Sequence, residues 1–176
     1  MKTKLIEEIS GYEALKILRR IAEKDPKISE QIERVAAQIL KEIDIEGICE
    51  EVYFVLDQIQ VEELWDRAGP KRDGYTSPAE MAVEMMAEVL EPYNEGVVRY
   101  LKLGMNQEAK LYCMGVLKGI YQFDQESKSE FKGWAVDYAG ECFEYLLKKW
   151  QHETNNKDAL IEMKQFLKKE CPKFQD

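Results

Sequence analysis

The sequence predicts an all-α fold, with six to eight helices arranged as antiparallel hairpins in a stack or a bundle. Apolar residues recur every three or four positions through most of the chain, which is the period of an amphipathic helix. Several of these segments begin with a Ser, Asp or Asn that is suited to cap a helix. The alternation of apolar and polar residues that is typical of a strand is not found.

Two helices are expected before residue 44. Ser10 and Glu13 have the spacing of a capping box and predict the start of the first helix. The Asp25-Pro26 pair is expected to end it, because the residue before a proline is disfavoured in helical conformation. Ser29 is expected to cap the second helix, and the short connection predicts an antiparallel hairpin. The apolar stripes are formed by Leu15, Leu18, Ile21 and Ala22 in the first helix and by Ile32, Val35, Ala36, Ile39, Leu40 and Ile43 in the second.

A third helix is expected over residues 44–59 and a short fourth helix over residues 61–68. In the short helix, Glu63 and Arg67 are four residues apart and face each other on the helix surface. The inward face of the third helix is formed by Ile48, Val52, Val55, Leu56 and Ile59.

A strong helix start follows at Ser77. Ser77 is a favourable N-cap, Pro78 is tolerated at the first helical position, and Glu80 has the capping-box spacing. Pro92 is expected to kink the helix or to end it and start another, because proline lacks the N–H that the helix needs. Gly104 is a good left-handed C-cap for the continuation.

The next helix is expected over residues 107–123, with Asn106 as its cap. Gly115 and Gly119 lie one turn apart on the same face. Glycine costs about 1 kcal/mol relative to alanine inside a helix. We therefore expect a neighbouring helix to approach the backbone closely at these two positions.

Two further helices complete the chain. Asp137 is expected to cap a helix over residues 138–152, and Asn156 stands at the start of the last helix, which ends at Cys171-Pro172. No linker or shift in composition marks a boundary, so the sequence predicts a single helical domain over residues 1–176.

Residues 100–119 resemble part of one tetratricopeptide repeat. Gly104 and Ala109, flanked by Tyr100 and Tyr121, match its spacing of small and aromatic residues, whereas its signature Trp and Pro are missing and no second copy follows. The resemblance implies a tetratricopeptide- or HEAT-like stacking of helical hairpins.

A broader stretch, residues 61–137, resembles the all-helical region that accompanies SWIM zinc fingers in some proteins and that also occurs in stand-alone relatives. The zinc finger, with its Cys-x-Cys and Cys-x-His, is absent. The resemblance therefore implies an accessory helical module and carries over no catalytic residue. It rests on Leu64-Trp65-Asp66-Arg67-Ala68-Gly69, Gly74-Tyr75-Thr76-Ser77-Pro78, Leu90-Glu91-Pro92-Tyr93, Leu103-Gly104, Gly115, Gly119-Ile120-Tyr121 and Trp134-Ala135-Val136-Asp137.

The charge of the chain argues against nucleic acid as a partner. Lys and Arg number 25 against 34 Asp and Glu, a net charge of -9, whereas sequence-independent binding to DNA or RNA needs a basic surface. Lysines are enriched from Lys148 to Lys173, which leaves open a cationic patch on the last two helices or a solvated helix face. No apolar run is long enough to span a membrane, and no signal peptide is found at the N-terminus. We expect a cytoplasmic protein.

Conventional catalytic and metal sites have no good candidates. His152 is the single histidine, and the four cysteines are far apart in the sequence, so a zinc site or a Ser-His or Cys-His pair is poorly supported. Neither a phosphate-binding glycine loop nor a dinucleotide-binding motif is present. The carboxylates of Glu80, Glu84 and Glu88 repeat every four residues, which is compatible with a shared divalent cation and also with a solvated face. We expect no cofactor and no metal.

The longest interruption of the helical pattern, residues 64–78, is the candidate site. Cations ahead of the helix start at Ser77 are typical of an anion site, since free N–H groups and the helix dipole favour negative charge there. Aromatic side chains in the same loop are suited to anchor a partner. In the alternative interpretation the loop is only structural, and Asp66 and Asp73 pair with the cations. The candidate ligand- or partner-binding residues are Trp65, Arg67, Lys71, Arg72, Tyr75 and Ser77.

The leading functional hypothesis is a non-enzymatic module that binds a protein or peptide near the middle helices. Helical stacks offer extended surfaces and rarely carry chemistry by themselves. Methionines gather in these helices and suit either an adaptable groove or the core. The alternative hypothesis is a binder, or hydrolase, of a small anionic ligand at the loop over residues 67–77. The sequence leaves the oligomeric state open.

Overall fold

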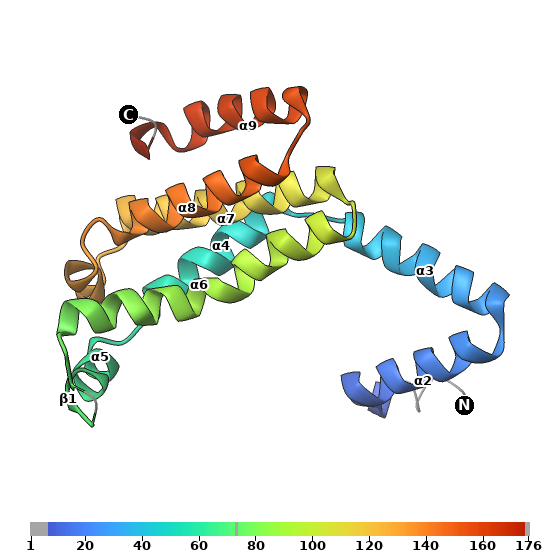
Figure 1. The fold of residues 1–176 in the computed structure, drawn as a ribbon, viewed down its shortest axis with the longest axis horizontal. Helices are drawn as coiled ribbons and strands as arrows, with labels where there is room; N and C mark the ends of the chain where they lie inside the picture. The colour runs from blue at the N-terminus through green and yellow to red at the C-terminus, as the bar shows by residue number, and fades with distance from the viewer. Residues whose placement is uncertain (1–6, 73, 175–176) are drawn as a thin grey trace. The chain divides into compact units, whose positions relative to one another are not determined.

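The structure, a computed structural model, describes residues 7–72 and 74–174, apart from the side chain of Lys71 (Figure 1). Within these residues there are eight α-helices, two short 3-10 helices and one pair of three-residue strands, so the all-α prediction is confirmed. Contacts divide the chain into two compact units, residues 1–42 and 43–176. The single domain expected over residues 1–176 remains a prediction, because the placement of one unit against the other is not determined.

The first unit is a helical hairpin of α2 (Gly11–Lys24) and α3 (Pro26–Lys41). The capping box of Ser10 and Glu13 is present as expected. The predicted cap Ser29 is wrong, because α3 begins one turn earlier. Asp25 is its N-cap and accepts a hydrogen bond from the backbone N–H of Lys27, and Pro26 takes the first helical position, where its missing N–H costs nothing.

The second unit is a helical bundle built around one helix, α7. In the pattern of helix contacts, α7 packs against four other helices, α4, α6, α8 and α9. In a linear stack each hairpin contacts only its neighbours, so these contacts describe a bundle. The elements are α4 (Ile45–Asp57), α5 (Val61–Arg67), α6 (Pro78–Lys102), α7 (Asn106–Glu126), α8 (Tyr138–Glu153) and α9 (Lys157–Glu170), with the 3-10 helices η1 (Glu130–Trp134) and η2 (Pro172–Phe174).

The close approach predicted at the two glycines of α7 is confirmed. A Cβ atom on Gly115 would lie 2.8 Å from the Cβ of Ile48, and one on Gly119 would lie 2.7 Å from the carbonyl oxygen of Cys49. Both neighbours belong to α4. The absence of side chains at these positions therefore lets α4 and α7 form the most extensive helix contact of the described chain.

Two local expectations are corrected. The alternative in which a helix ends at Pro92 is wrong, because α6 continues through Pro92 from Pro78 to Lys102. The alternative of a kink stays a prediction. Pro92 is exposed, while Leu90 and Tyr93 beside it are buried in the core, so packing maintains the helix and the missing bond faces solvent. The N-cap of α7 is Met105, not Asn106, and it makes no side-chain capping bond.

The methionines of the middle helices lie in the core. Met81, Met85, Met86 and Met114 are all buried in the same apolar cluster, together with Trp150. Of the two interpretations of the methionine cluster, core filling is the one that the structure supports. These four methionines therefore do not line an exposed groove.

Candidate functional site

The interrupting loop folds as a small β-hairpin. Strand β1 (Gly69–Lys71) pairs with β2 (Gly74–Thr76) in antiparallel register, with Pro70 opposite Tyr75. Gly69 and Gly74 have φ angles of 106° and 146°, which side-chain-bearing residues rarely adopt. Residues 64–78 were expected only as an interruption of the helical pattern, and the two strands were not predicted. Asp73 lies outside the described residues.

Arg67 is held by carboxylates of the same chain. Its guanidinium donates two hydrogen bonds to Glu88 of α6, at 2.9 and 2.7 Å, and approaches Glu63 at 3.6 Å. The hydrogen bonds with Glu88 raise its pKa, although burial opposes this. The ion pair with Glu63 was anticipated by spacing, whereas the bidentate partner Glu88 was not. Arg67 thus fastens α5 to α6.

The helix start at Ser77 is also occupied. The Ser77 hydroxyl accepts a hydrogen bond from the backbone N–H of Glu80 at 3.2 Å, and the Glu80 carboxylate accepts one from the N–H of Ser77 at 2.8 Å. The bond from Ser77 lowers the pKa of Glu80, so a negative charge already sits at this helix terminus. Arg72 is exposed in the turn between the strands. These contacts favour a structural role for Arg67 and Ser77.

The aromatic residues of the loop remain at the surface. Trp65 is 49% exposed and its ring contacts that of Trp134 in η1, with centroids 4.8 Å apart in an edge-to-face arrangement. Tyr75 is 67% exposed on strand β2. Val136, just after η1, is also exposed. Trp65 and Tyr75 were among the predicted site residues, whereas Trp134 was not, because it lies far from Trp65 in the sequence.

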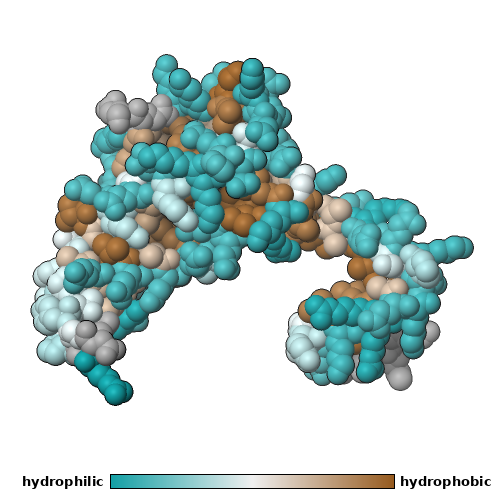
Figure 2. Space-filling view, viewed as in Figure 1, coloured by the Kyte–Doolittle hydropathy of each residue, from teal (hydrophilic) through white to brown (hydrophobic). Residues whose placement is uncertain are grey.

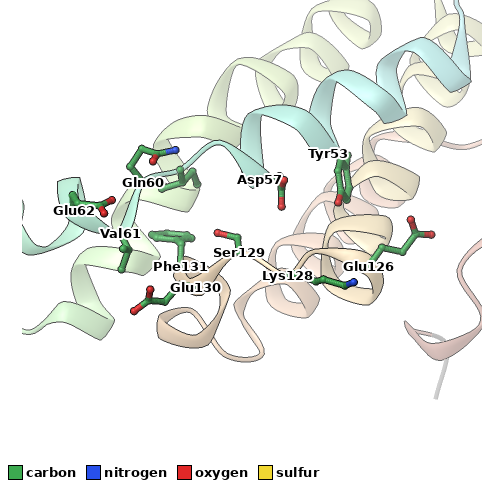
Figure 3. A pocket seen from close by; sticks show the side chains of 11 residues that line it. Tyr53, Asp57, Gln60, Val61, Glu62, Glu126, Lys128, Ser129, Glu130 and Phe131 are labelled. Atoms are coloured by element: carbon green, nitrogen blue, oxygen red, sulfur yellow. The ribbon is translucent and has the colours of Figure 1, made fainter.

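A cavity of about 520 Å³ is lined by residues of the same two elements, α5 and η1 (Figure 3). Val61 and Glu62 at the start of α5 line it together with Glu130 and Phe131 of η1. Trp65 and Trp134 stand three residues beyond Glu62 and Phe131, on the same two elements. Because α5 and η1 contribute to both the cavity and the aromatic pair, we call the two features together the α5–η1 surface.

The charged side chains that line the cavity are mainly acidic. Asp57 accepts a hydrogen bond of 2.6 Å from the Ser127 hydroxyl, which joins the end of α4 to the segment before η1. Partial burial and the nearby carboxylates raise the pKa of Tyr53, so its phenol stays protonated and is a hydrogen-bond donor. Carboxylates outnumber the single lysine in the lining. The charged residues there are Asp57, Glu62, Glu126, Lys128 and Glu130.

The described residues offer little for conventional chemistry. Among residues 7–72 and 74–174, no three His, Cys, Asp or Glu side chains gather as metal ligands would. The four cysteines are free, and burial raises the pKa of the Cys49 thiol to about 11 and that of Cys171 to about 12. Such thiols are poor nucleophiles at neutral pH.

No helix in the described chain is long and apolar enough to cross a membrane.

Comparisons with protein-family models, with curated proteins and with solved structures found no match to this chain.

Proposed function

We propose that this chain is a non-enzymatic protein-interaction module that binds a protein or peptide segment at the α5–η1 surface. The observation that carries the proposal is the exposed Trp65 in contact with Trp134. Tryptophan is enriched among the residues that dominate binding energy, since it offers a large, rigid contact area. An indole supported by a second indole is held in one orientation, so less conformational freedom is lost when a partner binds.

The acidic cavity indicates what kind of segment would fit. One of its carboxylates, Glu62, lies one helical turn from Trp65 on α5. Together the four carboxylates favour Lys or Arg side chains in a partner. A segment that combines an apolar residue for Trp65 with basic residues for the cavity matches both features. The resemblance to the helical region that accompanies SWIM zinc fingers agrees with an accessory binding role.

The alternative, a binder or hydrolase of a small anionic ligand at residues 67–77, has weaker support. Arg67 and Ser77 are both engaged by carboxylates of the chain, at Glu88 and Glu80. A ligand would have to displace these groups.

The four free thiols agree with a reducing compartment, and we propose that the protein is located in the cytoplasm.

A selection from a displayed peptide library tests the proposal. The wild-type chain is expected to enrich peptides with Lys or Arg close to an apolar residue, and Trp65→Ala is expected to weaken their binding by ~10-fold or more. Tyr145→Ala is the matched control, because Tyr145 is an equally exposed aromatic residue on α8. Equal binding to all three proteins would contradict the proposal, as would reproducible turnover in a substrate panel that Trp65→Ala leaves intact.

A further inference from the structure

The N-terminal hairpin presents an apolar face that its own two helices do not cover. Neither α2 nor α3 contains a buried residue. Figure 2 shows brown apolar surface on this hairpin, bordered by teal hydrophilic residues. The large apolar side chains that remain between 36% and 76% exposed are Tyr12, Leu15, Ile17, Leu18, Ile21, Ile28, Val35 and Ile39.

This face is too large for an isolated hairpin. The eight side chains expose on the order of 700 Å² of apolar surface, close to the ~800 Å² that each partner contributes to a standard protein interface. A unit of 42 residues is also near the size below which oligomerisation, metals or disulfides are usually needed for a stable fold. The hairpin therefore needs a partner that covers it along its length.

The spacing on α3 indicates that the partner is helical. Ile28, Ile32, Val35 and Ile39 follow one another at intervals of four, three and four residues. This is the apolar repeat of helices that pack side by side with a small crossing angle. Two helices that share such a face are half of a four-helix bundle.

The charge of the hairpin indicates a second copy as that partner. Residues 1–42 carry nine Lys and Arg against eight Asp and Glu, whereas residues 43–176 carry 16 against 26. Two copies of a nearly neutral hairpin meet without net repulsion. A strongly charged partner would gain little electrostatic attraction from a unit with almost no net charge.

We infer that the α2–α3 hairpin pairs with the same hairpin of a second copy, forming a four-helix bundle with two-fold symmetry. In such an interface the same residues meet on both copies, so one self-complementary apolar face is sufficient. The paired faces bury the area of a standard dimer interface. This inference does not rest on the proposal for the α5–η1 surface, because the residues that carry the two belong to different units.

Sedimentation equilibrium of the full chain tests the inference. The wild-type protein is expected at twice its monomer mass of 20.6 kDa, and Ile39→Glu is expected to raise the dissociation constant by about 100-fold, because each copy then buries a carboxylate in an apolar face. Ile161→Glu is the matched control, since Ile161 is similarly exposed on α9. It is expected to leave the dimer intact.

Cross-linking of mixed light and heavy isotope-labelled chains locates the contact. Links between copies are expected among Lys16, Lys24, Lys27 and Lys41 of the hairpin, and they should be lost in Ile39→Glu. A monomer at all concentrations would overturn the inference, whether or not the hairpin is folded. A dimer that Ile39→Glu leaves unchanged, or copies linked only through residues 43–176, would overturn it equally.

Discussion

Replacing Gly119 with Ala adds one methyl group at the tightest point between α4 and α7. The new Cβ would lie 2.7 Å from the carbonyl oxygen of Cys49 and 2.7 Å from the Cβ of Val52, whereas ordinary contacts lie at 3.4–4 Å. The carbonyl oxygen belongs to the backbone and cannot rotate away as a flexible side chain would. The two helices must therefore separate.

Two effects of opposite sign set the magnitude. Alanine favours the helix by about 1 kcal/mol relative to glycine, and overpacking a core costs about 1–3 kcal/mol, or more where nothing nearby can yield. Because one obstacle is backbone and α4–α7 is the most extensive helix contact, we expect the upper end of that cost. The free energy of unfolding should fall by about 2 kcal/mol, which corresponds to a Tm lower by about 4–8 °C.

Urea unfolding followed by far-UV circular dichroism measures this effect, with Gly140→Ala as the matched control. Gly140 lies inside α8, and a Cβ there would meet nothing within 4 Å. Its replacement is expected to raise the free energy of unfolding by up to about 1 kcal/mol. If Gly119→Ala were as stable as the wild type, or if both variants were stabilised, the close approach of α4 and α7 would be refuted.

Three further predictions follow from charged and thiol groups. Hydrogen bonds from Lys169 and Lys118 lower the pKa of Glu170, so its contribution to stability is present at neutral pH and is lost as the pH falls through the lowered pKa of the folded state. The difference in unfolding free energy between the wild type and Glu170→Gln should therefore close in urea titrations at low pH, and a difference that widens would contradict this. Glu162 pairs with the buried Lys110. Glu162→Ala should lower the free energy of unfolding by about 1–3 kcal/mol, allowing for the exposure of Glu162, whereas Lys110→Met should lower it less in the same assay. The reverse order would contradict a stabilising role for this ion pair. Burial raises the pKa of every thiol, so a colorimetric thiol reagent should react at least ~100-fold more slowly with the native chain than with the unfolded one. Rapid labelling of the native chain would contradict this, because it would require a solvent-accessible thiol. The thiols are Cys49, Cys113, Cys142 and Cys171.

The features that the sequence predicted well depend on neighbours in the chain. The capping boxes at Ser10 and Ser77 each involve a Glu three residues on, and both are present. Gly115 and Gly119 were predicted only in part, because glycine inside a helix indicates that another helix approaches closely but does not identify that helix. The structure identifies that partner as α4.

The features that the sequence missed depend on residues far apart in the chain. Arg67 binds Glu88, 21 residues away, and not the adjacent Asp66. Trp65 meets Trp134 only because η1 returns the chain to α5. Strands of three residues carry too few positions to show an alternating pattern, so β1 and β2 left no signal. The acidic cavity gathers residues from two distant stretches of the chain, 53–62 and 126–131, and had no local signature either.

The most direct test of the interaction proposal is the affinity of one selected peptide for three forms of the protein. Isothermal titration of the wild type, Trp65→Ala and Tyr145→Ala with that peptide compares them under one condition. We expect the dissociation constant of Trp65→Ala to be at least ~10-fold higher than that of the wild type, and that of Tyr145→Ala to be unchanged. In a second titration at low ionic strength, the dissociation constant of the wild type should be lower, because the cavity is acidic and the peptide is basic. A constant that Trp65→Ala leaves unaltered would contradict the claim that this chain binds its partner through the α5–η1 surface.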